Sequence, residues 1–199
     1  SPDLPFVLSI LLVVLFFLKS LESSSYIRQY FYMFLSGLFL STSFFIRSYM
    51  AFVPLFGLIP FIYYHLFRKK SILKILFCAG IFLGSIPTCL NLYFSVQKFG
   101  IVAIKTLFDF AKKQAVGEVV FDNLLLLPLN FIYLTFPIGI LLLFLFIFTK
   151  PNLKIKFPLL IYCYPFLSLI LLLCMSTSYP HYYLFLLPPL SIIFAIYLT

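Results

Sequence analysis

Charged residues are scarce in this sequence. They make up 10% of its 199 residues, and only five are acidic, whereas apolar residues make up 64%. Soluble domains usually carry about a quarter charged residues, and a soluble chain of this composition would leave most of its Phe, Leu and Ile exposed. Lipid solvates such side chains and requires only that backbone groups pair within helices. The composition therefore excludes a soluble domain and indicates an integral membrane protein.

Motifs of soluble enzymes are also missing: the sequence contains no GxGxxG, P-loop, HExxH or GxSxG pattern. Its few cysteines lie inside apolar runs, without a CxxC pair or a Cys–His spacing suited to a metal, at Cys78, Cys89, Cys163 and Cys174. We expect packing roles for them and predict no metal site. No cofactor is expected, although a requirement for a divalent metal stays open.

Long apolar runs dominate what is present. A helix needs about 20 apolar residues to cross the hydrocarbon. About seven runs meet or approach this length, at 4–18, 30–46, 49–67, 72–95, 124–148, 157–175 and 182–199. The first is short and could extend through Leu21. We predict an all-α, polytopic transmembrane bundle that forms a single domain over residues 1–199.

Basic residues are sorted between alternate connectors of these spans. One set of connectors carries nine Lys and Arg against Glu22, and the other carries five against four acids. By the positive-inside rule the first set is cytoplasmic, so Ser1 starts outside. We expect a multi-pass membrane protein. The formal charge of +9 then reflects contact with membrane lipids, and we expect no nucleic-acid partner, which would need a contiguous basic surface.

The outer loop 96–123 is the only long connector. Its apolar residues share one face of a helical wheel and its charged residues share the opposite face. We predict an amphipathic helix on the outer membrane surface. It would be either a plain connector or a lid over a site beneath it.

Two charged residues lie at predicted outer ends of spans. Asp3 precedes the first span, where it is either an N-cap or a carboxylate at the rim of a cavity. Arg47 interrupts apolar sequence where two spans meet in a tight outer turn. A guanidinium at this depth needs a partner. It would either reach lipid headgroups or bind a phosphate through its planar set of donors.

His181 and Tyr182 open the last predicted span, next to further tyrosines. His181 is the only histidine predicted on the outer side. An imidazole there could bind phosphate or sugar hydroxyls, or relay a proton, and the alternative is a hydrogen-bonded interfacial histidine.

The order of these segments resembles a known family. SPDLPF, a span, a basic loop and then SGLFLSTSFFIRSYMAFVPLFGLIPFIYYHLFRKK are similar to the middle of bacterial GT-C glycosyltransferases. These are the polyprenyl-phosphate-sugar transferases related to aminoarabinose transferase and protein O-mannosyltransferase. In that family an outer Thr-Lys or Thr-Arg turn is followed by a proline-bearing helix and an inner basic cluster. The closing PHYYLFLLPPLSIIFA resembles the late family segment that opens with an Arg-Tyr or His-Tyr pair.

This resemblance implies a location in the bacterial inner (plasma) membrane and transfer of a sugar from a polyprenyl-phosphate donor to a lipid, glycan or protein acceptor at its outer (periplasmic) face. The family's catalytic aspartate lies in the first outer loop, so the resemblance places the main base before Ser1. The chain opens without methionine or a signal peptide, and we expect a truncated fragment. Arg47, His181 and Tyr182 then become candidate contacts to the donor, and Asp3 a residue of the site rim.

Two other functions fit the same pattern. A transporter or flippase of lipid-linked saccharides would also use kinked helices and outer cations, and polar groups near the bilayer midplane would favour it. Asn91, Asn130 and Thr135 are the notable polar residues within spans, and none is charged. A non-catalytic subunit of a membrane complex is the third function. It would leave Arg47 and His181 against a partner or lipid.

Overall fold

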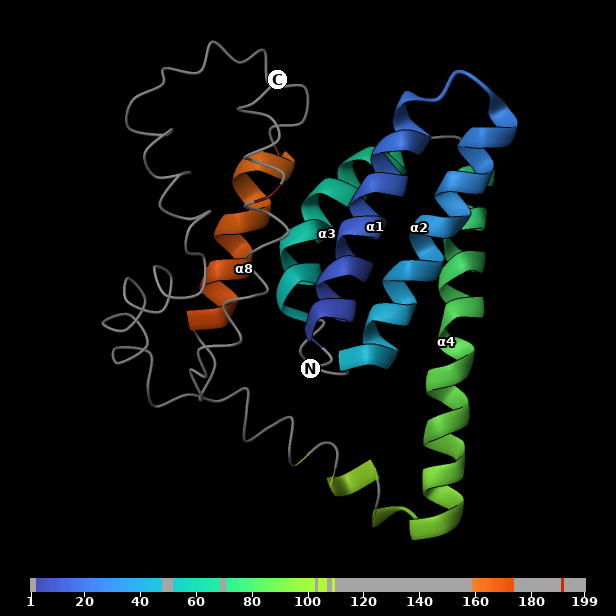
Figure 1. The fold of residues 1–199 in the computed structure, drawn as a ribbon, viewed down its shortest axis with the longest axis vertical. Coiled ribbons are helices and arrows are strands. Elements are labelled where there is room, and N and C mark those ends of the chain that lie inside the picture. Colours follow the sequence, from blue (N-terminus) through green and yellow to red (C-terminus); the bar gives the residue numbers. More distant parts are fainter. Residues whose placement is uncertain are drawn as a thin grey trace. The chain divides into compact units, whose positions relative to one another are not determined.

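A computed structural model describes residues 3–47, 52–68, 71–102, 104–106, 109, 159–173 and 191. Every regular element within these residues is helical (Figure 1). The elements are α1 (Asp3–Glu22), α2 (Tyr26–Arg47), α3 (Phe52–Phe67), α4 (Ser71–Phe99), the π-helical turn η2 (Leu159–Cys163) and α8 (Tyr164–Leu173). The chain divides into two compact units. Unit 1 is Ser1–Ala51 with Ile62–Ala111, and unit 2 is Phe52–Phe61 with Lys112–Thr199.

Three of the described helices are long and apolar enough to cross a membrane: Leu4–Glu22, Tyr26–Ile46 and Ser71–Phe99. A shorter apolar helix covers Leu55–Phe67. The all-helical prediction is therefore confirmed for the described residues, together with three membrane-spanning candidates. The predicted span 124–148, and all of 182–199 except residue 191, lie outside the described residues, so the count of seven stays a prediction.

The helices extend beyond the predicted apolar runs. α1 continues past Leu18 to Glu22, and the amide of Ser23 donates to the carbonyl of Lys19 at 3.0 Å. α4 continues through Gln97 and Lys98 and ends where Gly100 adopts a φ of 66°. The hydrogen-bond pattern of a helix does not depend on hydropathy, and a left-handed glycine is a common helix stop. Residues 96–99, predicted to start the outer amphipathic segment, therefore belong to α4.

Close backbone contact joins α2 to α4 in unit 1. The buried residues Leu73, Phe77, Gly80 and Gly84 recur along one face of α4, as expected for a packed helix. A Cβ atom on Gly84 would lie 2.6 Å from the carbonyl oxygen of Leu38, and one on Gly80 would collide with the carbonyl oxygen of Phe34. Gly37 on α2 makes the reciprocal approach to the backbone of Phe77. Small residues spaced four apart bring membrane helices together in this way.

α1 packs against the same helix α2 as an antiparallel neighbour (Figure 1). The hydroxyl of Ser36 donates across the interface to the carbonyl of Val13 at 3.0 Å. In this interface Phe16 stacks on Phe39 at 5.6 Å, and next to it Phe17 of α1 meets Phe77 of α4 edge-on at 6.1 Å. Unit 1 is thus a helix layer with α2 in contact with both α1 and α4.

The glycine contact gives a first prediction. Gly80→Leu forces a side chain into the α2 backbone, which cannot move aside as a flexible side chain would. We expect a loss of stability at or above the roughly 1–3 kcal/mol usual for overpacking, measured as a lower unfolding temperature by circular dichroism in micelles. Cys78→Leu is the matched control because Cys78 is exposed on the same helix. Equal melting of both variants would contradict the close α2–α4 contact.

The Ser36 hydrogen bond gives a second prediction. Ser36→Ala removes a hydrogen bond between two helices, which in membrane proteins contributes about 0.6 kcal/mol on average. We expect a small drop in the unfolding temperature. Ser85→Ala should have no effect, since the exposed Ser85 donates only to the carbonyl of Phe82 in its own helix. A larger drop in unfolding temperature for Ser85→Ala than for Ser36→Ala would argue against the α1–α2 packing.

Candidate functional site

Asp3 is the first residue of α1 and Arg47 is the last residue of α2. Their side chains lie outside the described residues, so only their places in the fold are known. An acid at the start of a helix and a base at its end both complement the helix dipole. The N-cap reading of Asp3 and a headgroup contact for Arg47 are compatible with these places, as is a substrate site.

The antiparallel packing of α1 and α2 brings these two positions to the same end of unit 1 (Figure 1). A common site for the two side chains stays a prediction, because only the helix ends are placed. His181 and Tyr182 lie outside the described residues, and so does most of the predicted outer segment. The predicted convergence of Asp3, Arg47 and His181 around one cavity therefore stays a prediction.

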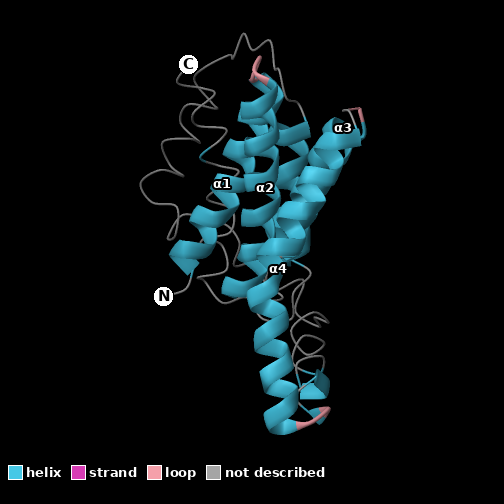
Figure 2. Ribbon diagram, turned by 90° about the vertical axis from the view of Figure 1, so that its right-hand side faces the viewer, coloured by secondary structure: helices cyan, strands magenta, loops and turns pink. Residues whose placement is uncertain are grey.

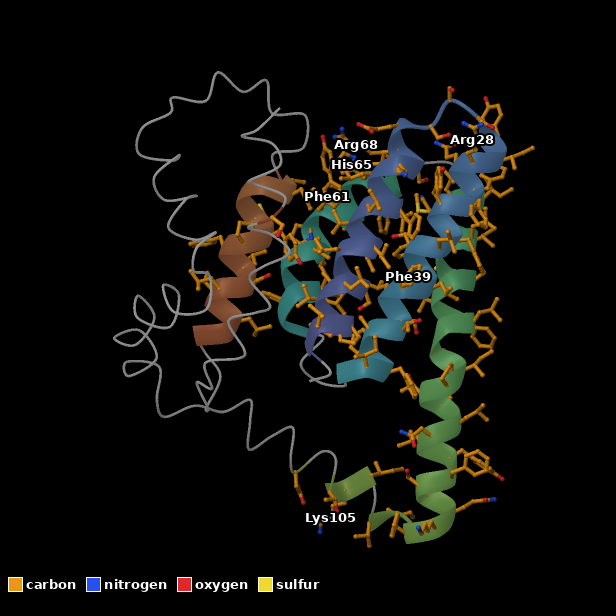
Figure 3. The ribbon with its side chains drawn as sticks, viewed as in Figure 1. Arg28, Phe39, Phe61, His65, Arg68 and Lys105 are labelled. Atoms are coloured by element: carbon orange, nitrogen blue, oxygen red, sulfur yellow. The ribbon has the colours of Figure 1, made fainter. Side chains whose placement is uncertain are left out.

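The opposite end of unit 1 is basic and aromatic. Arg28, His65 and Arg68 all lie at this end (Figure 3). The guanidinium of Arg68 lies 4.0 Å from the centre of the Tyr64 ring, and the ammonium of Lys74 lies 5.1 Å from that of Phe67. Cations near aromatic rings are typical of the membrane–water boundary, where a ring is half in lipid.

Lys19 belongs to the same basic end, with its ammonium 5.8 Å from the centre of the Tyr32 ring. The α1–α2 turn beside it is held by two reciprocal hydrogen bonds. The hydroxyl of Ser20 donates to the carbonyl of Gln29 at 3.0 Å, and the Gln29 amide donates to the carbonyl of Ser20 at 3.1 Å. This clamp fixes the start of α2 and thereby the position of Arg28.

The far end of α4 extends past the end of α2 (Figures 1 and 2). Large apolar side chains on this extension are exposed, among them Leu90, Tyr93 and Phe94. The Gln97 amide donates to the Tyr93 hydroxyl at 2.7 Å, and Lys98 lies 5.2 Å from the centre of the Phe99 ring. Lys74 and Lys98 are separated along α4 by roughly 36 Å, at 1.5 Å per residue. The two lysines thus flank a mainly apolar stretch of α4 whose length is close to the thickness of the hydrocarbon.

Chemistry-bearing clusters are few in the described part of the chain. No group of three or more His, Cys, Asp or Glu residues that could hold a metal ion occurs there. Cys78 and Cys89 are exposed and Cys163 is half-buried, each as a free thiol.

Sequence reasoning missed three buried hydroxyls that have no hydrogen-bond partner in the described part of the chain: those of Thr88 on α4 and of Tyr164 and Ser168 on α8. Tyr164 and Ser168 on α8 are fully buried, yet neither hydroxyl has a hydrogen-bond partner. The residue types alone do not predict unpartnered hydroxyls, because tyrosine and serine are common in membrane helices. The available signals were Pro165 between them and the small Gly57 at a similar depth of its own span.

Comparison with known proteins adds no relative to this picture: no protein family, curated protein or solved structure matches the chain. Its function must therefore be argued from the residues and their arrangement.

The predicted orientation of unit 1, with its basic end in the cytoplasm, gives a third prediction. Ser24 lies in the α1–α2 turn and Lys105 lies beyond α4 at the other end, and both are exposed. In intact cells, a thiol reagent that cannot cross membranes should label Lys105→Cys but label Ser24→Cys only after permeabilisation.

The parent protein, which carries native cysteines, serves as the control for background labelling. Labelling of Ser24→Cys in intact cells, with Lys105→Cys protected, would reverse the predicted orientation.

Proposed function

We propose that this chain belongs to a membrane glycosyltransferase that moves a sugar from a polyprenyl-phosphate carrier to an acceptor at the outer face of the bacterial plasma membrane. The observation that carries the proposal is the placement of Asp3 and Arg47 at one end of unit 1, opposite the end with Arg28 and Arg68. The basic end accounts for orientation. We therefore assign sugar transfer to the end that carries Asp3 and Arg47.

A lipid-linked sugar fits this arrangement physically. Its polyprenyl chain must lie among apolar helices while its phosphate and sugar stay at the interface. Arg47 ends an apolar helix at that level, where its guanidinium can offer two parallel hydrogen bonds to phosphate oxygens. The apolar helices α1, α2 and α4 supply the lipid-facing surface along which such a chain could lie.

The reaction exchanges one bond at the sugar's anomeric carbon. An acceptor hydroxyl or amine attacks this carbon and loses its proton to a general base, and the bond to the carrier phosphate breaks. The polyprenyl phosphate leaves as an anion, which Arg47 stabilises more strongly as its charge grows. The base is not assigned to a residue of this chain. Asp3 is proposed to line the site near the sugar, and His181 and Tyr182 stay sequence-based candidates for contacts to the donor.

A fourth prediction tests this role. In membranes containing the full-length protein, Arg47→Ala should reduce transfer from radiolabelled undecaprenyl-phosphate sugars by roughly tenfold to a hundredfold. This is the range expected for losing a charge-assisted hydrogen bond. Arg28→Ala is the matched control, since it removes the same side chain at the opposite end, and it should keep normal turnover.

Two results would count against the proposal. Normal transfer by a folded Arg47→Ala protein would remove Arg47 from the mechanism. A wild-type protein that transfers neither hexose nor pentose from such donors would overturn the transferase function itself.

A transporter or flippase of lipid-linked saccharides is the second candidate. The buried, unpartnered hydroxyls of Tyr164 and Ser168 favour it, because they lie near the middle of the predicted span 157–175 and transport sites usually lie near the bilayer midplane. Protein reconstituted in vesicles distinguishes the two candidates. A flippase moves a fluorescent lipid-linked sugar between leaflets without changing it chemically, whereas a transferase consumes it only when an acceptor is present.

A further inference from the structure

The glycine contacts between α2 and α4 determine how the two helices are aligned along their length. Gly80 approaches α2 between Phe34 and Leu38, and Gly84 approaches it between Leu38 and Ser41. The contact on α2 thus advances in the same direction as the contact on α4, so the helices are parallel. A residue of α4 is numbered about 44 higher than the residue of α2 at the same level.

The end of α2 therefore lies near the level of Asn91, and α4 extends beyond it. The alignment places Arg47, the last residue of α2, beside about residue 91 of α4. From there α4 continues to Phe99, about 12 Å further at 1.5 Å per residue (Figures 1 and 2). Burial changes at the same level, because the Thr88 hydroxyl is enclosed whereas Asn91 and the three residues after it are exposed.

The face of α4 that packs against α2 changes from apolar to polar at this level. Where α2 covers it, the face consists of the buried residues Leu73, Phe77, Gly80 and Gly84. The same spacing of four and three residues continues through Thr88, Asn91, Ser95 and Lys98. We call Asn91, Ser95 and Lys98 the polar face of α4. It begins where α2 ends.

The other sides of the α4 extension are mainly apolar. Leu90, Leu92 and Tyr93 are exposed there. Gln97 also lies on another side, where its amide donates to the Tyr93 hydroxyl at 2.7 Å. A helix end that projected into water would be polar all round. The restriction of Asn91 and its neighbours to the side of α2 instead indicates a polar ligand next to the end of α2.

The order of groups along the helices matches the order of groups in a lipid-linked sugar. The carrier chain lies in the hydrocarbon, its phosphate lies at the boundary, and the sugar lies beyond the phosphate because it is the most polar part. In unit 1 the apolar length of α2 leads to Arg47, and the polar face of α4 continues past it.

The side chains of the polar face also match the chemistry of a sugar. The carboxamide of Asn91 offers two donors and one acceptor, and the hydroxyl of Ser95 both donates and accepts. Sugar hydroxyls likewise donate and accept hydrogen bonds. Ser95 lies about 6 Å beyond Asn91 along the helix axis, so the two side chains can contact different hydroxyls of one sugar.

We infer that Asn91 and Ser95 bind hydroxyls of the sugar whose carrier phosphate is bound by Arg47. This inference rests on the proposed function and adds to it a contact that distinguishes a glycosylated carrier from the bare polyprenyl phosphate. After transfer the carrier keeps its phosphate contact and loses the contacts to α4, so the spent carrier binds more weakly than the donor.

The part of the affinity that depends on the sugar tests this inference. Full-length protein in phosphatidylcholine nanodiscs is titrated with undecaprenyl phosphate and with its glucose and arabinose derivatives. The wild type should bind at least one derivative about threefold to tenfold more tightly than undecaprenyl phosphate, as expected for one neutral hydrogen bond. Asn91→Ala should bind all three lipids alike, with the affinity that the wild type has for undecaprenyl phosphate. Ser95→Ala should lose part of the preference.

Two further variants serve as controls. Gln97→Ala removes a carboxamide from another side of the same helix and should keep the wild-type preference. Arg47→Ala should weaken the binding of all three lipids and leave the ratio of their affinities unchanged, because the phosphate is common to all of them.

The outcomes separate this inference from the proposed function. A folded Asn91→Ala protein that keeps the wild-type preference overturns the sugar contact and leaves the transferase function standing. Equal affinity of the wild type for all three lipids does the same. Loss of undecaprenyl phosphate binding in Asn91→Ala also overturns it, since Asn91 would then act on the phosphate or the fold. If the wild type binds none of the three lipids, the proposed function fails together with this inference.

Discussion

The close approach of α2 and α4 at glycine is the contact on which unit 1 depends. Lipid is as apolar as the helix surfaces, so the hydrophobic effect gives little reason for two spans to associate. The attraction between two spans then comes from van der Waals packing, which becomes stronger as their backbones come closer. Gly37, Gly80 and Gly84 remove the side chains that would keep α2 and α4 apart. The parallel pair then serves as the support on which α1 packs through Ser36 and its aromatic neighbours.

This packing determines which helix termini lie together at each end of unit 1. Because α1 and α2 are antiparallel, the start of α1 and the end of α2 share one end, and the α1–α2 turn shares the other with the start of α4. The clamp between Ser20 and Gln29 holds the basic end in place. The chemistry proposed for Arg47 therefore rests on helix direction: a guanidinium at the start of α2 would lie at the basic end of unit 1 instead, which the charge sorting predicts to be cytoplasmic.

Hydropathy and charge sorting predict the coarse fold well. The apolar runs 4–18, 30–46 and 72–95 correspond to α1, α2 and α4, and Lys19, Arg28, Arg68 and Lys74 all fall at helix ends. Helix ends are predicted less well, because α1 and α4 continue through polar residues until a turn or Gly100 stops them. Which helices pack against each other cannot be predicted from a single sequence. Gly80 and Gly84 indicate a close contact but do not name α2, and Tyr164 becomes notable only when its neighbours are known. The roles of Asp3, Arg47, His181 and Tyr182 rest on their residue types and remain predictions.

The central claim is that the Asp3–Arg47 end of unit 1 handles a lipid-linked phosphate. Photocrosslinking with a polyprenyl phosphate that carries a diazirine next to its phosphate, mapped by mass spectrometry, tests this claim most directly. The account predicts crosslinks to the last turns of α2, near the exposed Phe45, and their loss when unlabelled polyprenyl phosphate competes. Crosslinks confined to the α1–α2 turn and the end of α3, beside Arg28 and Arg68, would contradict it.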